Sequence, residues 1–215
     1  MREPILADEP VLHEQYASLE RQALTLRFGM WLFLASELLL FSGFFALYAA
    51  YRAMYGAEFV EALRHNTMIH GTLNMYMLLT SSFTVALSVR AVRHEALRRA
   101  QALVLASAAL GVTFLVIKAL EYAVHIEDGA LPGPYFHLSE LPTLGANRFY
   151  TLYWITTGAH ALHVAGGVGV LLWLAWFLPT GRYRADYHPK FENATLYWHF
   201  VDVMWLFIWP IYYLV

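Results

Sequence analysis

Cysteine is missing from this sequence of 215 residues, and charged residues are scarce. Without cysteine the chain can form no disulfide, no thiolate metal site and no thiol nucleophile. Charged residues make up only 14% of the chain, against about 25% in an average soluble domain, and hydrophobic residues make up 59%. The formal net charge of −2 gives no reason to expect nucleic-acid binding. This composition is typical of an integral membrane protein.

Long apolar stretches account for most of the chain, and five of them reach the roughly 20 residues that a transmembrane helix needs. They cover residues 28–51, 67–89, 100–124, 149–178 and 194–215. Isolated spans in lipid must be helical, because only a helix satisfies its own backbone groups there. The sequence therefore predicts an all-α bundle of five transmembrane helices over residues 28–215. Residues 1–27 are polar and lack an apolar core behind a basic start, so we expect no cleavable signal peptide.

Lysine and arginine are distributed unevenly between the two sides of this predicted bundle. Residues 1–27 and the connections after the second and fourth spans hold 10 of these cations, and the other side holds 3. Cytoplasmic loops carry the excess of Lys and Arg in membrane proteins. We therefore expect a cytoplasmic N-terminus and a periplasmic C-terminus, as an odd number of spans requires.

Several ionisable residues fall inside the predicted spans, where a charge costs ~2.5–3.5 kcal/mol on insertion scales. At ~1.5 Å per residue, Glu37, His160 and Asp202 all lie near mid-depth, so they could meet in the bundle interior. His160 and His163 are spaced i,i+3, as are His199 and Asp202, so each pair shares one face of its helix. The remaining intramembrane ions, Lys118 and Glu121, have the same spacing, which predicts a local salt bridge close to the outer interface, where the lysine can snorkel. The candidate residues for an intramembrane polar or proton-related network are Glu37, Glu121, His160, His163, His199 and Asp202.

These residues allow more than one interpretation. Histidines with carboxylates on three helices would suit iron, zinc or copper, and paired histidines could hold haem. However, bundle metal sites usually repeat a Glu-x-x-His unit on two helices, and this sequence lacks that unit. Hydrogen bonds that tie helices together explain the same residues, and for Glu37 a proton relay and a hydrogen-bond anchor both remain open. From the residues alone, a metal or haem site is therefore less favoured than a hydrogen-bond network.

Two further features concern packing and lipid. Ala161, Ala165 and Gly169 form a row of small residues that predicts a close helix approach. Arg182, Arg184 and His188 lie at the predicted cytoplasmic mouth, where they could hold anionic lipid headgroups. An ordinary positive loop explains those three residues equally well.

Five motifs, in order along the chain, resemble subunit III of the haem–copper oxidases. The closing stretch Tyr197-Trp-His-Phe-Val-Asp202-Val-Met-Trp-Leu-Phe207 is similar to the last helix of that family, and Gly29-Met-Trp-Leu-Phe-Leu-Ala-Ser-Glu37 resembles its glutamate-bearing helix. The others are residues 78–84, Leu120-Glu121-Tyr122 and Thr157-Gly-Ala-His160-Ala-Leu-His163-Val. The resemblance extends from residue 27 to nearly the end of the chain.

This resemblance implies a non-catalytic subunit of a bacterial terminal oxidase in the cytoplasmic membrane. The family's subunit III holds no haem or copper, and these cofactors belong to partner subunits. The resemblance therefore implies no catalytic residue and no metal site in this chain. It packs on subunit I, which reduces dioxygen to water and pumps protons, and it supports the stability and proton uptake of that subunit. Subunit II, a small subunit IV and bound phospholipid are the other expected partners. In the family, the glutamate matching Glu37 reacts with carbodiimides.

The sequence departs from the family in two places. Longer members have two helices before the glutamate-bearing one, and their lipid cleft lies between that pair and the rest. Here another subunit would have to supply that wall. The family's His-His-Phe-Gly-Phe-Glu is Tyr187-His-Pro-Lys-Phe-Glu192 in this chain, which weakens the expectation of headgroup binding there.

Two alternatives stand beside this hypothesis. One is a five-helix accessory protein of a nitric oxide reductase, which would share the motifs but serve assembly or stability. The other is a free-standing metal-dependent membrane enzyme built on the intramembrane histidines and carboxylates. The electron donor of the expected oxidase, cytochrome c or quinol, is decided by another subunit and is left open.

Overall fold

The computed structural model describes residues 12–66, 68–180 and 189–214, and within these ranges every regular element is a helix, as predicted. Five helices are long: α1 (Leu19–Met54), α3 (Met68–Arg93), α4 (Leu97–Glu127), α5 (Leu144–Phe177) and α6 (Pro189–Tyr213). The short helix α2 (Gly56–His65) follows α1. Two single turns of 3-10 helix, η1 (Gly133–Tyr135) and η2 (Leu178–Thr180), lie before and after α5.

Four helices among the described residues are long and apolar enough to cross a membrane, namely α1, α3, α4 and α5. Helix α6 has the length, with 25 residues, but is not one of these four. Polar side chains such as Asn193, His199 and Asp202 lower its hydropathy. The all-helical membrane fold is thus confirmed, whereas the fifth span and the orientation of the termini remain predictions.

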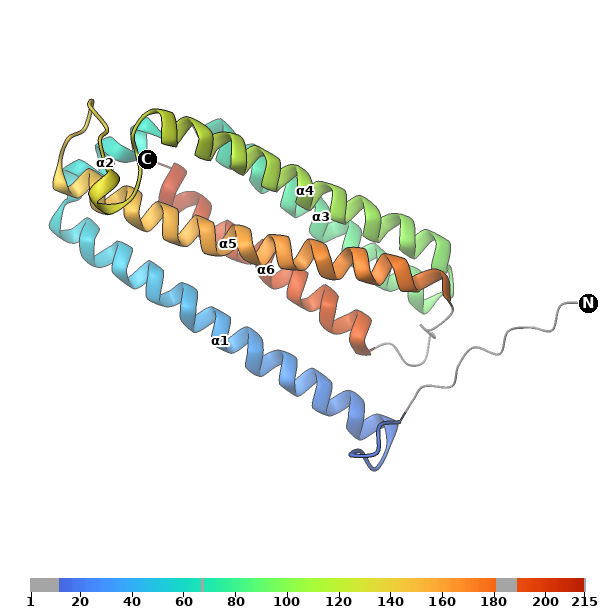
Figure 1. Ribbon diagram of the computed structural model, residues 1–215. Helices are drawn as coiled ribbons and strands as arrows, with labels where there is room; N and C mark the ends of the chain where they lie inside the picture. The colour runs from blue at the N-terminus through green and yellow to red at the C-terminus, as the bar shows by residue number, and fades with distance from the viewer. Residues whose placement is uncertain (1–11, 67, 181–188, 215) are drawn as a thin grey trace, which may run out of the picture.

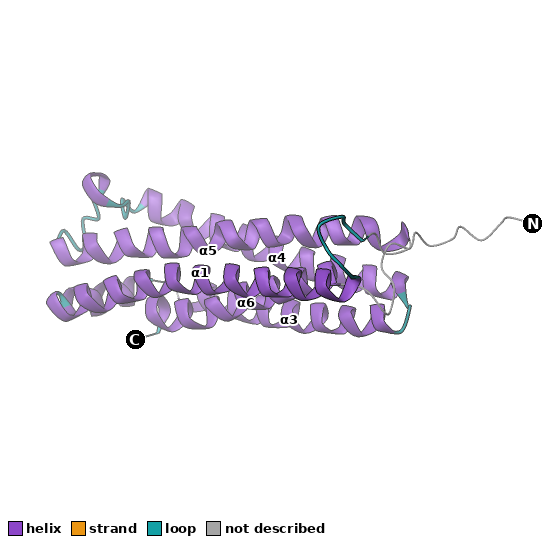
Figure 2. Ribbon diagram, turned by 90° about the horizontal axis from the view of Figure 1, so that it is seen from below, coloured by secondary structure: helices purple, strands orange, loops and turns teal. Residues whose placement is uncertain are grey.

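The long helices lie side by side (Figures 1 and 2). Helix α3 packs against α4 and α6, and α5 packs against the same two helices, so these four form a closed group. Helix α1 contacts α5 and α6 and lies along one edge of the group. It is also the least buried, with 11% of its most apolar segment buried compared with 33–39% for the other three spans. A large apolar face of α1 is therefore left for lipid or another protein.

The two ends of the bundle differ. One end, called here the α2 end, carries α2, residues 128–143 between α4 and α5, and the last described residues of α6 (Figure 1). The opposite end carries the start of α1, the α3–α4 turn, the end of α5 and the start of α6. Hydrogen bonds order residues 128–143 against α5, because Trp154 Nε1 donates to the Ala130 carbonyl at 2.8 Å and Asn147 Nδ2 to the Gly133 carbonyl at 2.9 Å.

Several helix boundaries differ from the predicted spans. Helix α1 begins at Leu19, inside the segment predicted to be polar and separate, because the Ser18 hydroxyl caps it by accepting from Arg21 N at 3.2 Å. Helix α2 was not predicted at all. Its apolar residues Phe59, Ala62 and Leu63 share one buried face, a spacing typical of a short amphipathic helix.

Helix α6 is held to α3 by a row of tryptophans. The Nε1 atoms of Trp198, Trp205 and Trp209 donate to Ser81 Oγ at 3.0 Å, Gly71 O at 3.4 Å and Thr72 Oγ1 at 3.3 Å. A buried indole normally finds such a partner, and these bonds fix the register of the two helices.

The predicted row of small residues on α5 does not make the close approach. Gly169 has no atom within 4 Å of an added Cβ, and Ala165 is exposed. Instead, a Cβ at Gly167 would lie 2.7 Å from the Trp198 ring, and one at Gly111 would meet the same ring at 2.7 Å. The large Trp198 side chain therefore requires the two glycines that flank it.

Candidate functional site

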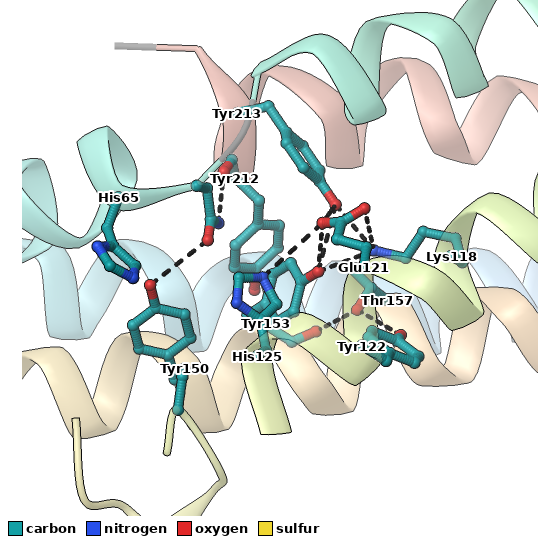
Figure 3. Close-up of polar contacts among 12 residues, drawn as sticks. His65, Lys118, Glu121, Tyr122, His125, Tyr150, Tyr153, Thr157, Tyr212 and Tyr213 are labelled. Atoms are coloured by element: carbon teal, nitrogen blue, oxygen red, sulfur yellow. Dashed lines mark hydrogen bonds and ion pairs between the residues drawn. The ribbon is translucent and has the colours of Figure 1, made fainter. Parts of the chain in front are cut away.

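A buried lysine and glutamate form the centre of a polar cluster near the α2 end (Figure 3). Lys118 and Glu121, both on α4, are 1% and 3% exposed, and Lys118 Nζ lies 3.3 Å from Glu121 Oε2. Two tyrosines connect the pair to other helices: Lys118 Nζ donates to Tyr153 OH at 2.9 Å and to Tyr213 OH at 2.8 Å. Each hydroxyl in turn donates to Glu121 Oε1, at 2.5 and 2.6 Å. We call these four residues the Lys118–Glu121 cage.

The predicted salt bridge between Lys118 and Glu121 is confirmed, but its setting differs from the prediction. The lysine does not snorkel; it lies within the bundle, with Nζ 4.7 Å from the centre of the Tyr122 ring and 5.7 Å from that of Trp205. Such aromatic faces attract a desolvated cation. Because Tyr153 belongs to α5 and Tyr213 to α6, the cage joins three helices around one ion pair.

A second polar pair joins α1 to α5. His163 Nε2 lies 2.8 Å from Glu37 Oε2, and His163 Nδ1 lies 2.7 Å from the carbonyl oxygen of Ala159. A carbonyl only accepts, so Nδ1 carries a hydrogen. Nε2 then either accepts from a neutral Glu37 carboxyl or, as part of an imidazolium, donates to the carboxylate. In both states the pair holds one proton between its side chains and has no net charge.

This pair is only partly enclosed, with the Glu37 side chain 17% exposed and that of His163 19% exposed. Glu37 therefore has a polar partner at the edge of the bundle, as an intramembrane carboxylate requires. The sequence suggested that Glu37, His160 and Asp202 could meet, but the structure joins Glu37 to His163 instead.

His160 lies in the core, and its ring makes no hydrogen bond to another described residue. It is fully buried, its ring stacks on Trp205 at a centroid distance of 5.1 Å, and Phe114 contacts it edge-on at 5.5 Å. Neither of its ring nitrogens has a partner among the described residues. The i,i+3 spacing correctly places it near His163, but the two histidines have separate surroundings.

His199 and Asp202 also differ in their environments. His199 Nδ1 lies 2.6 Å from Ser82 Oγ, a bond between α6 and α3. Asp202 is 3% exposed, and neither of its carboxyl oxygens has a hydrogen-bond partner in the described structure. Ser82 lies near it, but its hydroxyl bonds to His199.

The donor set can be compared with what a metal or haem needs. The described residues bring no three His, Asp or Glu side chains together in a way that could hold a metal ion. His163 and His199 use ring nitrogens for bonds to Glu37 and Ser82, while aromatic rings enclose His160. The residues as placed do not fit such a group. The suggested lipid-headgroup residues Arg182, Arg184 and His188 lie outside the described residues.

A pocket is present at the opposite end of the bundle. Glu192, at the start of α6, accepts from Arg27 of α1 at 2.7 Å and from Arg93 of α3 at 3.2 Å. These residues line a cavity of about 440 Å³ whose apolar part includes Trp31 and Leu196. Two arginines beside an apolar wall are suited to an anionic amphiphile.

Comparison with known families decides what kind of protein carries these clusters. Residues 15–215 match the family model described as cytochrome c oxidase subunit III. The chain belongs to the cytochrome c oxidase subunit III family. The resemblance found in the sequence motifs is thereby confirmed, and with it a family of membrane-spanning subunits of haem–copper oxidase complexes.

Individual relatives in the subunit III family come from several bacterial groups. Cytochrome c oxidase subunit 3 of Bacillus sp. strain PS3 is 32% identical over 209 residues, which cover 95% of this chain and 92% of that protein. The protein of the same name in Synechocystis is 32% identical over 188 residues, covering 87% and 74%. Quinol oxidase subunit 3 of Bacillus spizizenii is 28% identical over 188 residues, covering 86% and 85%.

The sequence of this subunit III family member did not indicate the role of several residues in these clusters. Tyr153 and Tyr213 complete the cage but look like ordinary interfacial aromatics in an apolar span. His125 and His65 lie just outside the predicted spans, so their positions in the sequence gave no reason to expect a role for either. The one available signal was His125 at i+4 from Glu121, which places both on one face of α4.

Proposed function

We propose that this chain is a non-catalytic subunit III of a bacterial terminal oxidase in the cytoplasmic membrane. In that assembly subunit I, with its haem and copper, reduces dioxygen to water and translocates protons, and subunit II and a small subunit IV complete the complex. This chain packs against subunit I and supports its stability and proton uptake. The bacterial relatives and the broad apolar face of α1 support this assignment.

The observation that carries the proton-uptake part is the Glu37–His163 pair. It holds one proton with no net charge, so it can remain in an apolar setting at a small cost. Its partial exposure leaves it accessible from the edge of the bundle where α1 lies. A neighbouring subunit or a water chain at that edge could therefore exchange a proton with it.

The cavity at the opposite end of the bundle supports the proposal that the chain binds phospholipid. Its arginines, Arg27 and Arg93, would face the headgroup phosphate, while Trp31 and Leu196 would contact the first part of an acyl chain. Replacing both arginines with glutamine should remove co-purifying anionic lipid in native mass spectrometry. Retention of the lipid by the double variant would contradict this assignment.

The complex itself tests the function. The tagged chain, extracted in mild detergent, should co-purify with an oxidase subunit I and show the optical spectrum of its haems. Recovery with a nitric oxide reductase would instead indicate an accessory protein of that enzyme. Recovery alone with stoichiometric metal would favour an independent metal-dependent enzyme.

A further inference from the structure

His125 has a buried ring that makes no hydrogen bond to any described residue. It is 4% exposed, and both of its ring nitrogens lack a partner among the described residues. Its ring packs edge-on against Tyr150 and Tyr153, at centroid distances of 5.5 and 5.1 Å. A buried polar group without a protein partner usually bonds to an ordered water molecule.

On its inner side, His125 faces the Lys118–Glu121 cage. His125 Nε2 lies 3.9 Å from Glu121 Oε1, which is beyond a direct hydrogen bond but within the span of one bridging water. Glu121 Oε2 lies 3.3 Å from Lys118 Nζ but has no hydrogen bond within the described part of the chain. A water molecule between the two side chains would therefore find at least two polar partners, which is what a buried water needs.

On the side of His125 away from the cage, His65 is a titratable, partly exposed group (Figure 3). His65, in the last turn of α2, has Nδ1 3.4 Å from Glu140 Oε2 and Nε2 3.9 Å from Asp128 Oδ2. These carboxylates are 73% and 42% exposed, and His65 is 23% exposed. His65 and Asp128 both lie within electrostatic range of His125, as do Lys118 and Glu121. Figure 3 shows the row from His65 to Lys118.

We propose that His125, with water bound at its ring nitrogens, links the aqueous surface at the α2 end to the Lys118–Glu121 cage as a proton path. A hydronium ion at the surface protonates His65. The proton passes through water to one nitrogen of His125, and the other nitrogen releases a proton through water to Glu121. Return of the ring to its first tautomer restores the path, so His125 gains and loses one proton in each passage.

The lysine content of the chain makes this path measurable. Lys118 and Lys190 are the only lysines in the sequence, and Lys190 is exposed. The full chain, labelled with ¹⁵N at the lysine Nζ and placed in lipid nanodiscs, should give two ammonium signals. After transfer to D₂O the Lys190 signal should disappear first and serve as an internal marker. The decay of the Lys118 signal then reports proton exchange between the cage and water.

Replacement of His125 tests the link. The variant His125→Phe keeps a ring against Tyr150 and Tyr153 but removes both nitrogens, and we expect it to slow exchange at Lys118 by at least about tenfold. His65→Gln should slow exchange at Lys118 as well. Because this variant leaves the interior unchanged, it still tests the path if His125→Phe fails to fold. His137→Phe, at an exposed histidine in residues 128–143 between α4 and α5, should leave the rate as in the wild type.

The direction of the change separates a path from a structural role. If Lys118 exchanged only when the bundle opened locally, a destabilising replacement of His125 would speed exchange. Unchanged or faster exchange in His125→Phe would therefore overturn the proposal. So would unchanged exchange in His65→Gln, or equal slowing in His137→Phe.

Discussion

Removal of the buried ammonium by Lys118→Met is expected to destabilise the bundle strongly. Methionine has a similar length and fills the space between the aromatic rings, so packing is largely kept. What disappears is the positive charge beside Glu121 and the donor to Tyr153 and Tyr213. Glu121 would then be a buried carboxylate with no compensating cation.

The size of the effect follows from these contacts. A hydrogen bond to a charged group contributes about 1.5–3 kcal/mol, and Lys118 makes two of them in addition to the ion pair. Breaking a buried pair by removing one partner costs about 3–5 kcal/mol, because the remaining charge is left uncompensated. We therefore expect Lys118→Met to lower the free energy of unfolding by about 3–5 kcal/mol.

Charge compensation in the cage also predicts how a double variant behaves. In the double variant Lys118→Met/Glu121→Gln no charge is left buried, and the amide of Gln still bonds to the tyrosine hydroxyls. The double variant should therefore be more stable than Lys118→Met alone, with a coupling energy of about 0.5–3 kcal/mol.

Unfolding by SDS from lipid bicelles, followed by tryptophan fluorescence, measures these differences. Lys190→Met at the exposed lysine is the matched control and should change stability by about 0.5 kcal/mol or less. A loss below about 1 kcal/mol in Lys118→Met, or additive effects in the double variant, would refute the assignment of the cage as a charge-compensated cluster.

Two further predictions use the same assay. Gly167→Ala should lower the free energy of unfolding by about 1–3 kcal/mol, because its Cβ would lie 2.7 Å from the Trp198 ring. Gly43→Ala, whose Cβ would have no atom within 4 Å, should instead stabilise α1 by about 0.5–1 kcal/mol. Equal effects of the two variants would contradict the packing described. Glu37→Leu should cost about 1–3 kcal/mol by leaving His163 Nε2 without a partner, while Glu37→Gln, which still donates to that atom, should stay within about 1 kcal/mol of the wild type. An equal change in the free energy of unfolding in both variants would contradict the conclusion that this hydrogen bond holds α1 to α5.

The membrane fold could be predicted because apolar length alone identifies a span. Four predicted spans coincide with helices that are long and apolar enough to cross a membrane. Helix ends were less accurate, since a cap such as Ser18 extends α1 beyond its apolar part. Helix α2 was missed because its 10 residues are too short for a span and four of them are charged or polar.

The pairing of the site residues could be predicted only within one helix. The i,i+3 spacing correctly gave the Lys118–Glu121 contact. Between helices it gave nothing, because spans that are apolar on every side show no stripe to indicate which face meets which neighbour. The partners of Glu37 and His199 therefore came from the structure, as did the role of Tyr213 at the far end of the chain.

The most direct test of the central claim is to compare the oxidase purified with and without this chain. If the chain is a non-catalytic subunit III, the preparation lacking it should keep its haem spectrum and its initial dioxygen reduction per haem. It should take up protons more slowly and lose activity sooner during turnover, and adding back the purified chain should reverse both changes. Loss of haem with the chain, or identical proton uptake and lifetime in the two preparations, would contradict this assignment.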